Sequence, residues 1–193
     1  MNQKKSVFSL LGGIFLMCSG FFMLVTTASN MIRSVRAATS IGNILALNID
    51  ILLLLCGLFI LLRRKLPAAI MMCAVVALFL SNVAYNLTAG GASYNWLITG
   101  CILGAYTLFA AGLFGRGVYA LVMCLCAAAL RFVPFVRQLI GFPSLVKYNS
   151  GLLLVNNLSS LFGTVLMIAA MVMAGLWLLG LVRQKQAQPP YRG

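Results

Sequence analysis

The sequence predicts an all-α polytopic membrane protein with six transmembrane helices and one short amphipathic helix at the membrane interface. Of its 193 residues, 63% are hydrophobic and 8% are charged, whereas about a quarter of the residues in a soluble domain carry a charge. The apolar residues form runs of about 18 or more, the length that a helix needs to cross a bilayer. No polar segment is long enough to build its own core, so residues 1–193 are predicted to form one integral membrane domain.

The first predicted span, 7–27, is an apolar run that follows Lys4 and Lys5. It is longer than the roughly 7–15 apolar residues of a signal peptide, so we interpret it as a retained helix. Ser9 and Gly13 lie one helical turn apart, a spacing of small residues that lets a neighbouring helix approach closely.

The second and third predicted spans are separated by the basic segment 63–65. The second span, 43–62, ends where this segment begins, because charged side chains are costly in the hydrocarbon core. The third span, 66–83, has Pro67 in its first turn, where a missing backbone N–H removes no helical hydrogen bond. The uncharged, glycine-containing link 85–95 follows it.

The fourth predicted span, 96–114, begins with Trp96, a residue type that is enriched at membrane interfaces. Gly100 and Gly104 have the GxxxG spacing of a helix-packing face. The fifth span, 117–134, follows a tight glycine-containing turn.

The sixth predicted span, 155–182, belongs to an apolar stretch that starts at residue 151. A helix over 151–182 would reach roughly 48 Å at about 1.5 Å per residue, more than a ~30 Å hydrocarbon core needs. We therefore expect this helix to tilt strongly or to begin outside the core.

Residues 131–141 have the pattern of a short amphipathic helix. Apolar residues recur at positions i, i+3, i+4, i+7 and i+8, namely Phe132, Phe135, Val136, Leu139 and Ile140. The opposite side carries Arg131, Arg137 and Gln138. Such a helix suits the membrane surface or the cap of a cavity. Alternatively, it continues from the fifth span with a bend at Pro134.

Six spans place both chain ends on one side of the membrane, and the basic residues then divide unequally. Nine share the side of the chain ends: Lys4, Lys5, Arg63, Arg64, Lys65, Arg116, Arg183, Lys185 and Arg192. Five take the other side: Arg33, Arg36, Arg131, Arg137 and Lys147. By the positive-inside rule, we expect cytoplasmic ends in a bacterial cytoplasmic membrane. Basic residues at span ends, without a patch of exposed aromatics, indicate membrane lipids as partners and exclude nucleic acid.

Asp50 is the sole acidic residue of the chain, and it lies inside the second predicted span. Its position is roughly 9 Å inside the apolar run that begins near Ile44. A carboxylate inside the span costs a few kcal/mol, about 2.5–3.5 at the bilayer centre, and is expected to face protein or water and to have a partner. Two interpretations remain open, a functional contact with a proton, cation or substrate, or a structural ion pair with Arg131.

The polar residues of the predicted spans collect in the outer half of the membrane. In that half, a pocket open to the outside is predicted from Asn43, Asp50, Ser81, Asn82, Arg131, Asn156 and Ser160. Such a pocket, bordered by the five outer basic residues, suits a small or anionic solute. Alternatively, these polar residues simply mark the membrane interface.

The favoured function is therefore the binding or transport of a small solute. The architecture is similar to that of the substrate-binding subunits of energy-coupling vitamin importers, although the first span lacks their A-x-x-x-A repeat. The alternative function is a non-catalytic scaffold or assembly subunit with partner membrane subunits. An enzyme is not expected, since the chain has one Asp, no Glu and no His for acid–base chemistry. No cofactor or metal site is predicted, because the six cysteines lack metal-ligand spacing.

Overall fold

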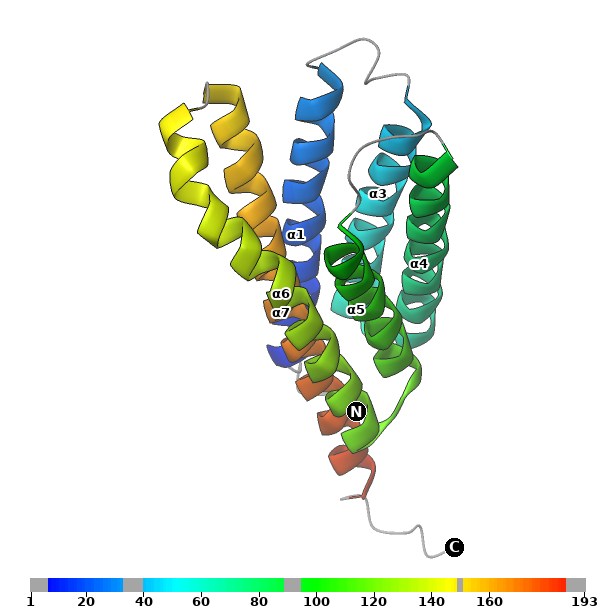
Figure 1. The fold of residues 1–193 in the computed structure, drawn as a ribbon. Coiled ribbons are helices and arrows are strands. Elements are labelled where there is room, and N and C mark those ends of the chain that lie inside the picture. The colour runs from blue at the N-terminus through cyan, green and yellow to red at the C-terminus, as the bar shows by residue number, and fades with distance from the viewer. Residues whose placement is uncertain (1–6, 33–39, 89–94, 149–150, 187–193) are drawn as a thin grey trace, which may run out of the picture.

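The computed structural model describes residues 7–32, 40–88, 95–148 and 151–186. These residues form six helices and no strand: α1 (Val7–Ile32), α3 (Ile41–Leu61), α4 (Lys65–Thr88), α5 (Trp96–Phe114), α6 (Gly117–Tyr148) and α7 (Gly151–Gln186) (Figure 1). All six are long and apolar enough to cross a membrane. The chain is thus a small integral membrane protein, and the predicted fold class is confirmed.

Each predicted span corresponds to one helix, and the differences lie at the ends. The fourth span has the bounds of α5, 96–114. α1 continues past the predicted end at 27 to Ile32, and α4 continues past 83 to Thr88. These extra turns carry polar residues and lie beyond the apolar runs. They remain helical because the helix keeps its backbone hydrogen bonds after it leaves the apolar layer.

Residues 131–141 continue the fifth span, as the second interpretation expected, and form no separate helix, because α6 runs without interruption through Pro134 and Pro143. Breaking the helix would free several backbone groups, whereas one proline removes a single hydrogen bond. Of the predicted apolar face, Phe132 and Ile140 are exposed and are free to contact lipid. Arg131 is buried inside the bundle, which agrees with its predicted place in the pocket and not with an exposed polar side of an interfacial helix.

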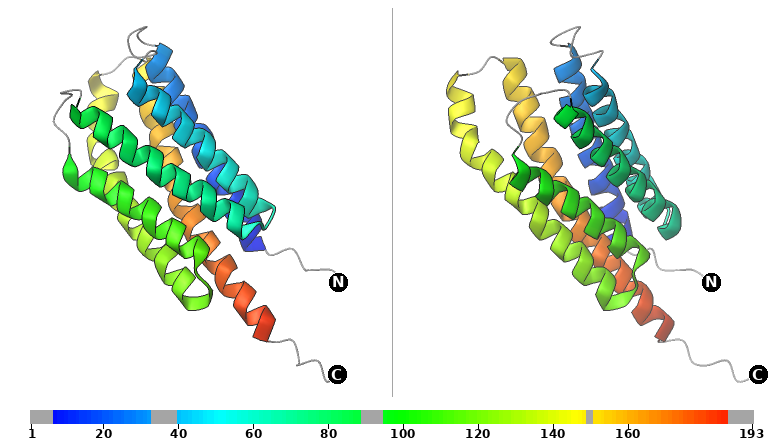
Figure 2. Two further views of the ribbon diagram at one scale, coloured as in Figure 1. Left: turned by 90° about the vertical axis from the view of Figure 1, so that its right-hand side faces the viewer. Right: turned by 45° about the vertical axis from the view of Figure 1, so that its right-hand side comes forward.

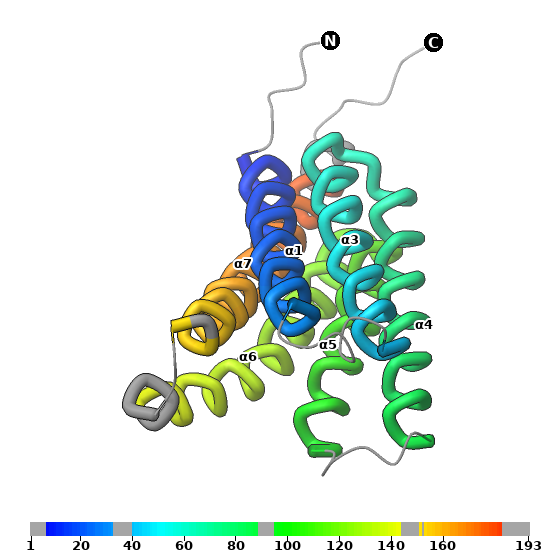
Figure 3. The backbone as a smooth tube through the Cα atoms, turned by 90° about the horizontal axis from the view of Figure 1, so that it is seen from above, coloured from blue at the N-terminus to red at the C-terminus, as the bar shows by residue number. Residues whose placement is uncertain are grey.

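The helices pack as a closed ring in the order α1, α3, α4, α5, α6, α7 and back to α1 (Figure 3). Consecutive helices are joined by short connections and therefore run antiparallel. The beginning of α1 and the end of α7 lie at the same end of the ring as the α3–α4 and α5–α6 turns (Figure 2). We call this the terminal end, and we call the other the loop end.

Glycines allow α1 and α3 to pack closely. A Cβ on Gly13 would lie 2.7 Å from the backbone nitrogen of Leu61, and one on Gly57 would lie 2.7 Å from that of Met17. Gly13 is thus the site of close helix contact that was predicted, and the helix that approaches it is α3. Gly100 has no atom within 4 Å of such a Cβ, so it packs against no other described helix.

Candidate functional site

Four helices surround a pocket of about 150 Å³ inside the ring. It is lined from α3, α4, α5 and α6 by Ala46, Ile49, Asp50, Phe79, Asn82, Ile102, Tyr106 and Arg131. Asp50 lies roughly 14 Å along α3 from its first residue, Ile41. Because α3 has 21 residues and is about 32 Å long, the pocket lies near the middle of the bundle.

Asp50 is held in place by α1. Its side chain is 6% exposed. The Oδ2 atom accepts a hydrogen bond of 2.7 Å from the Oγ1 hydroxyl of Thr27. The other carboxylate oxygen, Oδ1, accepts no hydrogen bond from the described residues. One oxygen is thus fixed by the protein, and the other retains its capacity to bind a donor.

Arg131 faces Asp50 from the other side of the ring, on α6. Its side chain is 5% exposed, and Nε and Nη1 are buried without a hydrogen-bond partner in the part of the chain that the structure describes. The guanidinium carbon lies 5.4 Å from the centre of the Tyr106 ring, a cation–π contact. The Tyr106 ring in turn makes an edge-to-face contact with Phe79, with ring centres 5.8 Å apart. Aromatic packing thus positions the guanidinium and leaves its N–H donors available.

The structural ion pair between Asp50 and Arg131 is not formed. Within the described part of the chain, no Lys or Arg nitrogen lies within 4.0 Å of a carboxylate oxygen. The two opposite charges instead line one pocket and leave space between them. This arrangement allows a third group to interact with both.

Of the three remaining predicted residues of α3 and α4, one lines the pocket and two do not. Asn82 lines the pocket, and its Oδ1 accepts a hydrogen bond of 2.8 Å from Asn86. Ser81 is exposed and donates to the Ala77 carbonyl of its own helix at 3.0 Å, so it lies outside the pocket. Asn43, in the first turn of α3, is half-buried and also does not line the pocket.

Asn156 and Ser160 belong to a separate group of polar side chains, which we call the α7 polar seam: Asn30, Gln138, Asn156, Ser160 and Thr164. Asn156 donates to Asn30 of α1 at 2.9 Å, and Gln138 of α6 donates to Ser160 at 3.1 Å. These bonds connect α7 to its two ring neighbours. The single predicted pocket is therefore two polar regions, and only Asp50, Asn82 and Arg131 of the predicted residues share the pocket inside the ring.

Two residues of the site, Thr27 and Tyr106, were not predicted from the sequence. Thr27 is the last residue of the first predicted span, and a hydroxyl at the end of an apolar run can bond a buried acid. Tyr106 is the one tyrosine within 96–114, and its isolation among aliphatic residues was a usable signal.

Comparisons with protein-family models, with curated proteins and with solved structures found no match. Within the described residues, no group of three or more His, Cys, Asp or Glu side chains could hold a metal ion. What the pocket presents is one carboxylate, one guanidinium, an aromatic ring and an amide. These groups can bind and orient a small polar molecule by charge and hydrogen bonding.

Proposed function

We propose that the chain binds a small solute with an anionic group in the pocket of Asp50 and Arg131 and carries it across the membrane. The main support for the proposal is the buried guanidinium of Arg131, whose Nε and Nη1 have no acceptor among the described residues. A buried charge without a hydrogen-bonding partner is strongly unfavourable. A carboxylate or phosphate on the solute would supply the acceptors, and a guanidinium binds such groups in a bidentate manner.

The proposed solute is small and also carries a hydrogen-bond donor. The volume of about 150 Å³ is about that of an engineered protein cavity that binds benzene. The Oδ1 of Asp50 bonds no described residue and can accept from a hydroxyl or ammonium group, while Thr27 fixes Oδ2. The pocket thus suits a molecule with one anionic end and one donor end.

The proposed orientation places the loop end outside and the terminal end in the cytoplasm of a bacterial cell. The basic residues Arg63, Arg64, Lys65 and Arg116 lie in turns at the terminal end, as the positive-inside rule requires for a cytoplasmic face. The pocket then lies near the middle of the membrane, at the midpoints of α3, α5 and α6. We propose no reaction in this pocket. Asp50 is its one carboxylate, and its lining has no second carboxylate or histidine to serve as the other partner in acid–base catalysis.

Native mass spectrometry of the protein, extracted gently from its own membrane, tests this proposal. The expected result is a bound small molecule that is present in the wild type and absent from Arg131→Gln. Ser81→Ala is the matched control, since Ser81 is polar and lies on a pocket helix but outside the pocket. Loss of the molecule from both variants, or its retention in Arg131→Gln, contradicts the proposal.

A second candidate function is a scaffold subunit that binds partner membrane helices. Gly100 favours it, because this glycine is exposed on α5 and a Cβ added to it would meet nothing within 4 Å. A small residue on an outer helix face permits close approach by another helix. Under this function, Gly100→Leu disrupts a co-purifying complex, whereas Arg131→Gln leaves that complex intact.

A further inference from the structure

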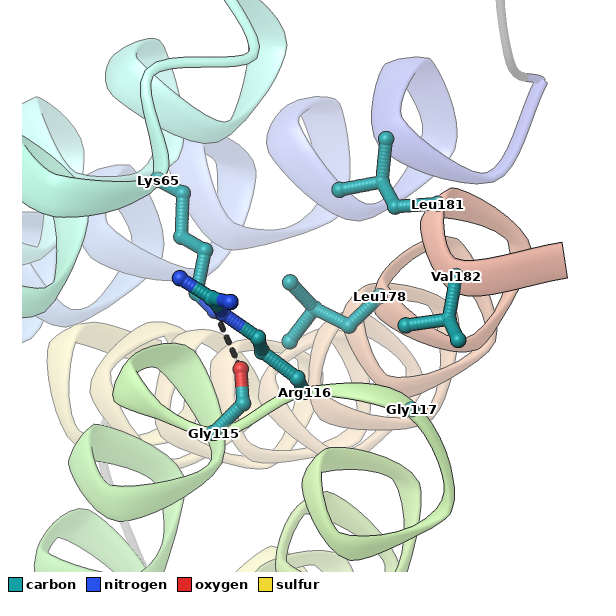
Figure 4. A pocket seen from close by; sticks show the side chains of 7 residues that line it. All are labelled: Lys65, Gly115, Arg116, Gly117, Leu178, Leu181 and Val182. Atoms are coloured by element: carbon teal, nitrogen blue, oxygen red, sulfur yellow. Dashed lines mark hydrogen bonds between the residues drawn. The ribbon is translucent and has the colours of Figure 1, made fainter. Parts of the chain in front are cut away.

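A second and larger pocket, of about 480 Å³, lies at the terminal end of the bundle. It is formed where the α3–α4 and α5–α6 turns meet the last turns of α7 (Figure 4). Its lining residues are Lys65, Gly115, Arg116, Gly117, Leu178, Leu181 and Val182. Because α4, α6 and α7 are long and apolar enough to span the membrane, the pocket lies where these spans end. This is the level at which lipid headgroups are found.

Two cationic side chains meet in this pocket. The Nζ of Lys65 donates hydrogen bonds to the carbonyl oxygens of Gly115 and, at 3.2 Å, Phe114. The Arg116 side chain extends towards Lys65 (Figure 4), and it makes no hydrogen bond or ion pair with any described residue. The chain's one acidic residue, Asp50, belongs to the other pocket. The two like charges are therefore close together, and no carboxylate of the described residues neutralises them.

The other wall of the pocket is apolar. Leu178, Leu181 and Val182 of α7 face the two cations across the pocket (Figure 4). Gly117 begins α6 with φ of 61°, a conformation that other residues adopt only with strain. This glycine brings the start of α6 close to Val182. The lining is thus cationic on one side and apolar on the other.

We infer that this pocket binds the phosphate group of an anionic phospholipid. Lys65 and Arg116 would hold the phosphate, and the leucine and valine side chains of α7 would contact the first part of an acyl chain. Basic pockets between membrane helices are suited to anionic headgroups. A free phosphate ion shares the headgroup chemistry but makes no use of the apolar wall. The inference is independent of the proposed solute site, because it involves neither Asp50 nor Arg131.

The test uses the purified full chain in detergent and native mass spectrometry. The probes are phosphatidylglycerol, phosphatidylcholine and inorganic phosphate, each titrated separately. We expect one phosphatidylglycerol to bind and Arg116→Gln to weaken it about fivefold, the effect of removing one cation. Arg64→Gln is the matched control, because Arg64 is an exposed cation near the same turn that does not line the pocket. Lys65 is left unchanged, since its bonds to α5 hold the turn together.

The outcomes distinguish a specific phosphate site from general attraction between the basic chain and anionic lipid. An equal loss in Arg116→Gln and Arg64→Gln overturns the inference, as does phosphatidylcholine binding as tightly as phosphatidylglycerol. Absence of binding by both phosphatidylglycerol and inorganic phosphate also overturns it. If inorganic phosphate binds, depends on Arg116 and displaces phosphatidylglycerol, the phosphate site is supported with a soluble ligand as its source. If phosphatidylglycerol binds in an Arg116-dependent way and inorganic phosphate does not bind, the bound phosphate group is that of the lipid.

Discussion

The hydroxyl of Thr27 on α1 donates a 2.7 Å hydrogen bond to the Oδ2 of Asp50 on α3. This bond joins two neighbouring helices of the ring at the level of the pocket. It satisfies one oxygen of the chain's sole acidic side chain and leaves Oδ1 without a partner among the described residues. The same bond therefore serves the packing of α1 against α3 and the orientation of Asp50.

Replacing Thr27 with valine is expected to lower the free energy of unfolding by about 1.5–3 kcal/mol, because a hydrogen bond to a charged group is lost and nearly the same shape is kept. Thermal unfolding in detergent measures the change. Thr107→Val is the control, since Thr107 is exposed and bonds only the Leu103 carbonyl of its own helix. If both variants unfold at the same temperature, the Thr27–Asp50 bond has no special role.

Replacing Asp50 and Arg131 together, with leucine and methionine, is expected to raise the free energy of unfolding of the solute-free protein by about 1–4 kcal/mol. The reason is that two buried charges, one of them a guanidinium with two nitrogens that bond no described residue, are exchanged for apolar side chains. Chemical denaturation of the purified protein in the absence of solute measures this. Replacing Arg131 alone is the comparison, and it is expected to lower stability because it leaves Asp50 buried without an opposite charge. A double variant less stable than the wild type would contradict this account of the two charges.

Replacing Gly57 with alanine is expected to lower the free energy of unfolding by about 1–3 kcal/mol, the usual cost of overpacking. The added Cβ would lie 2.7 Å from the backbone nitrogen of Met17 and 2.9 Å from the carbonyl oxygen of Gly13, so α1 and α3 must move apart. Gly100→Ala adds the same methyl group where nothing lies within 4 Å. A comparison of the two melting temperatures checks the close packing, and equal values would contradict it.

Replacing Arg63 with glycine is expected to stabilise the protein by about 1 kcal/mol, because a side chain in the left-handed region is strained there. Arg63 has φ of 59° at the end of α3, and the N–H of Arg64 bonds the Phe59 carbonyl at 2.8 Å in a Schellman-type cap. Arg64→Gly serves as the control, since Arg64 has no positive φ. Thermal unfolding that shows no gain for Arg63→Gly relative to Arg64→Gly would contradict this interpretation of the cap.

The number and positions of the helices were predictable, because the apolar runs are long and their ends are marked by charged, proline or glycine residues. α5 illustrates this, with Trp96 and Phe114 as predicted. The amphipathic pattern at 131–141 was misleading, because exposed apolar residues on a membrane helix face lipid rather than a protein core. Phe132 and Ile140 are exposed for that reason.

The partners within the site were harder to predict, because they depend on the order of the helices around the ring. The sequence indicated that Asp50 needs a partner, and Arg131 was the obvious choice by charge. The hydrogen-bonding partner is Thr27, since α1 packs against α3 whereas α6 lies across the ring. Asn156 and Ser160 share a helix face as expected, but that face meets α1 and α6. Periodicity defines a face and does not say which helix will cover it.

The measurement that tests the proposed solute site most directly is isothermal titration of the purified protein with small carboxylates and phosphates. Each active solute is then titrated into Arg131→Met and Asp50→Asn. We expect at least one solute to bind the wild type, with binding lost in Arg131→Met and weakened in Asp50→Asn, while both variants remain folded. If no such solute binds the wild type, or if one binds Arg131→Met equally well, Arg131 does not hold an anionic group and the proposed function is wrong.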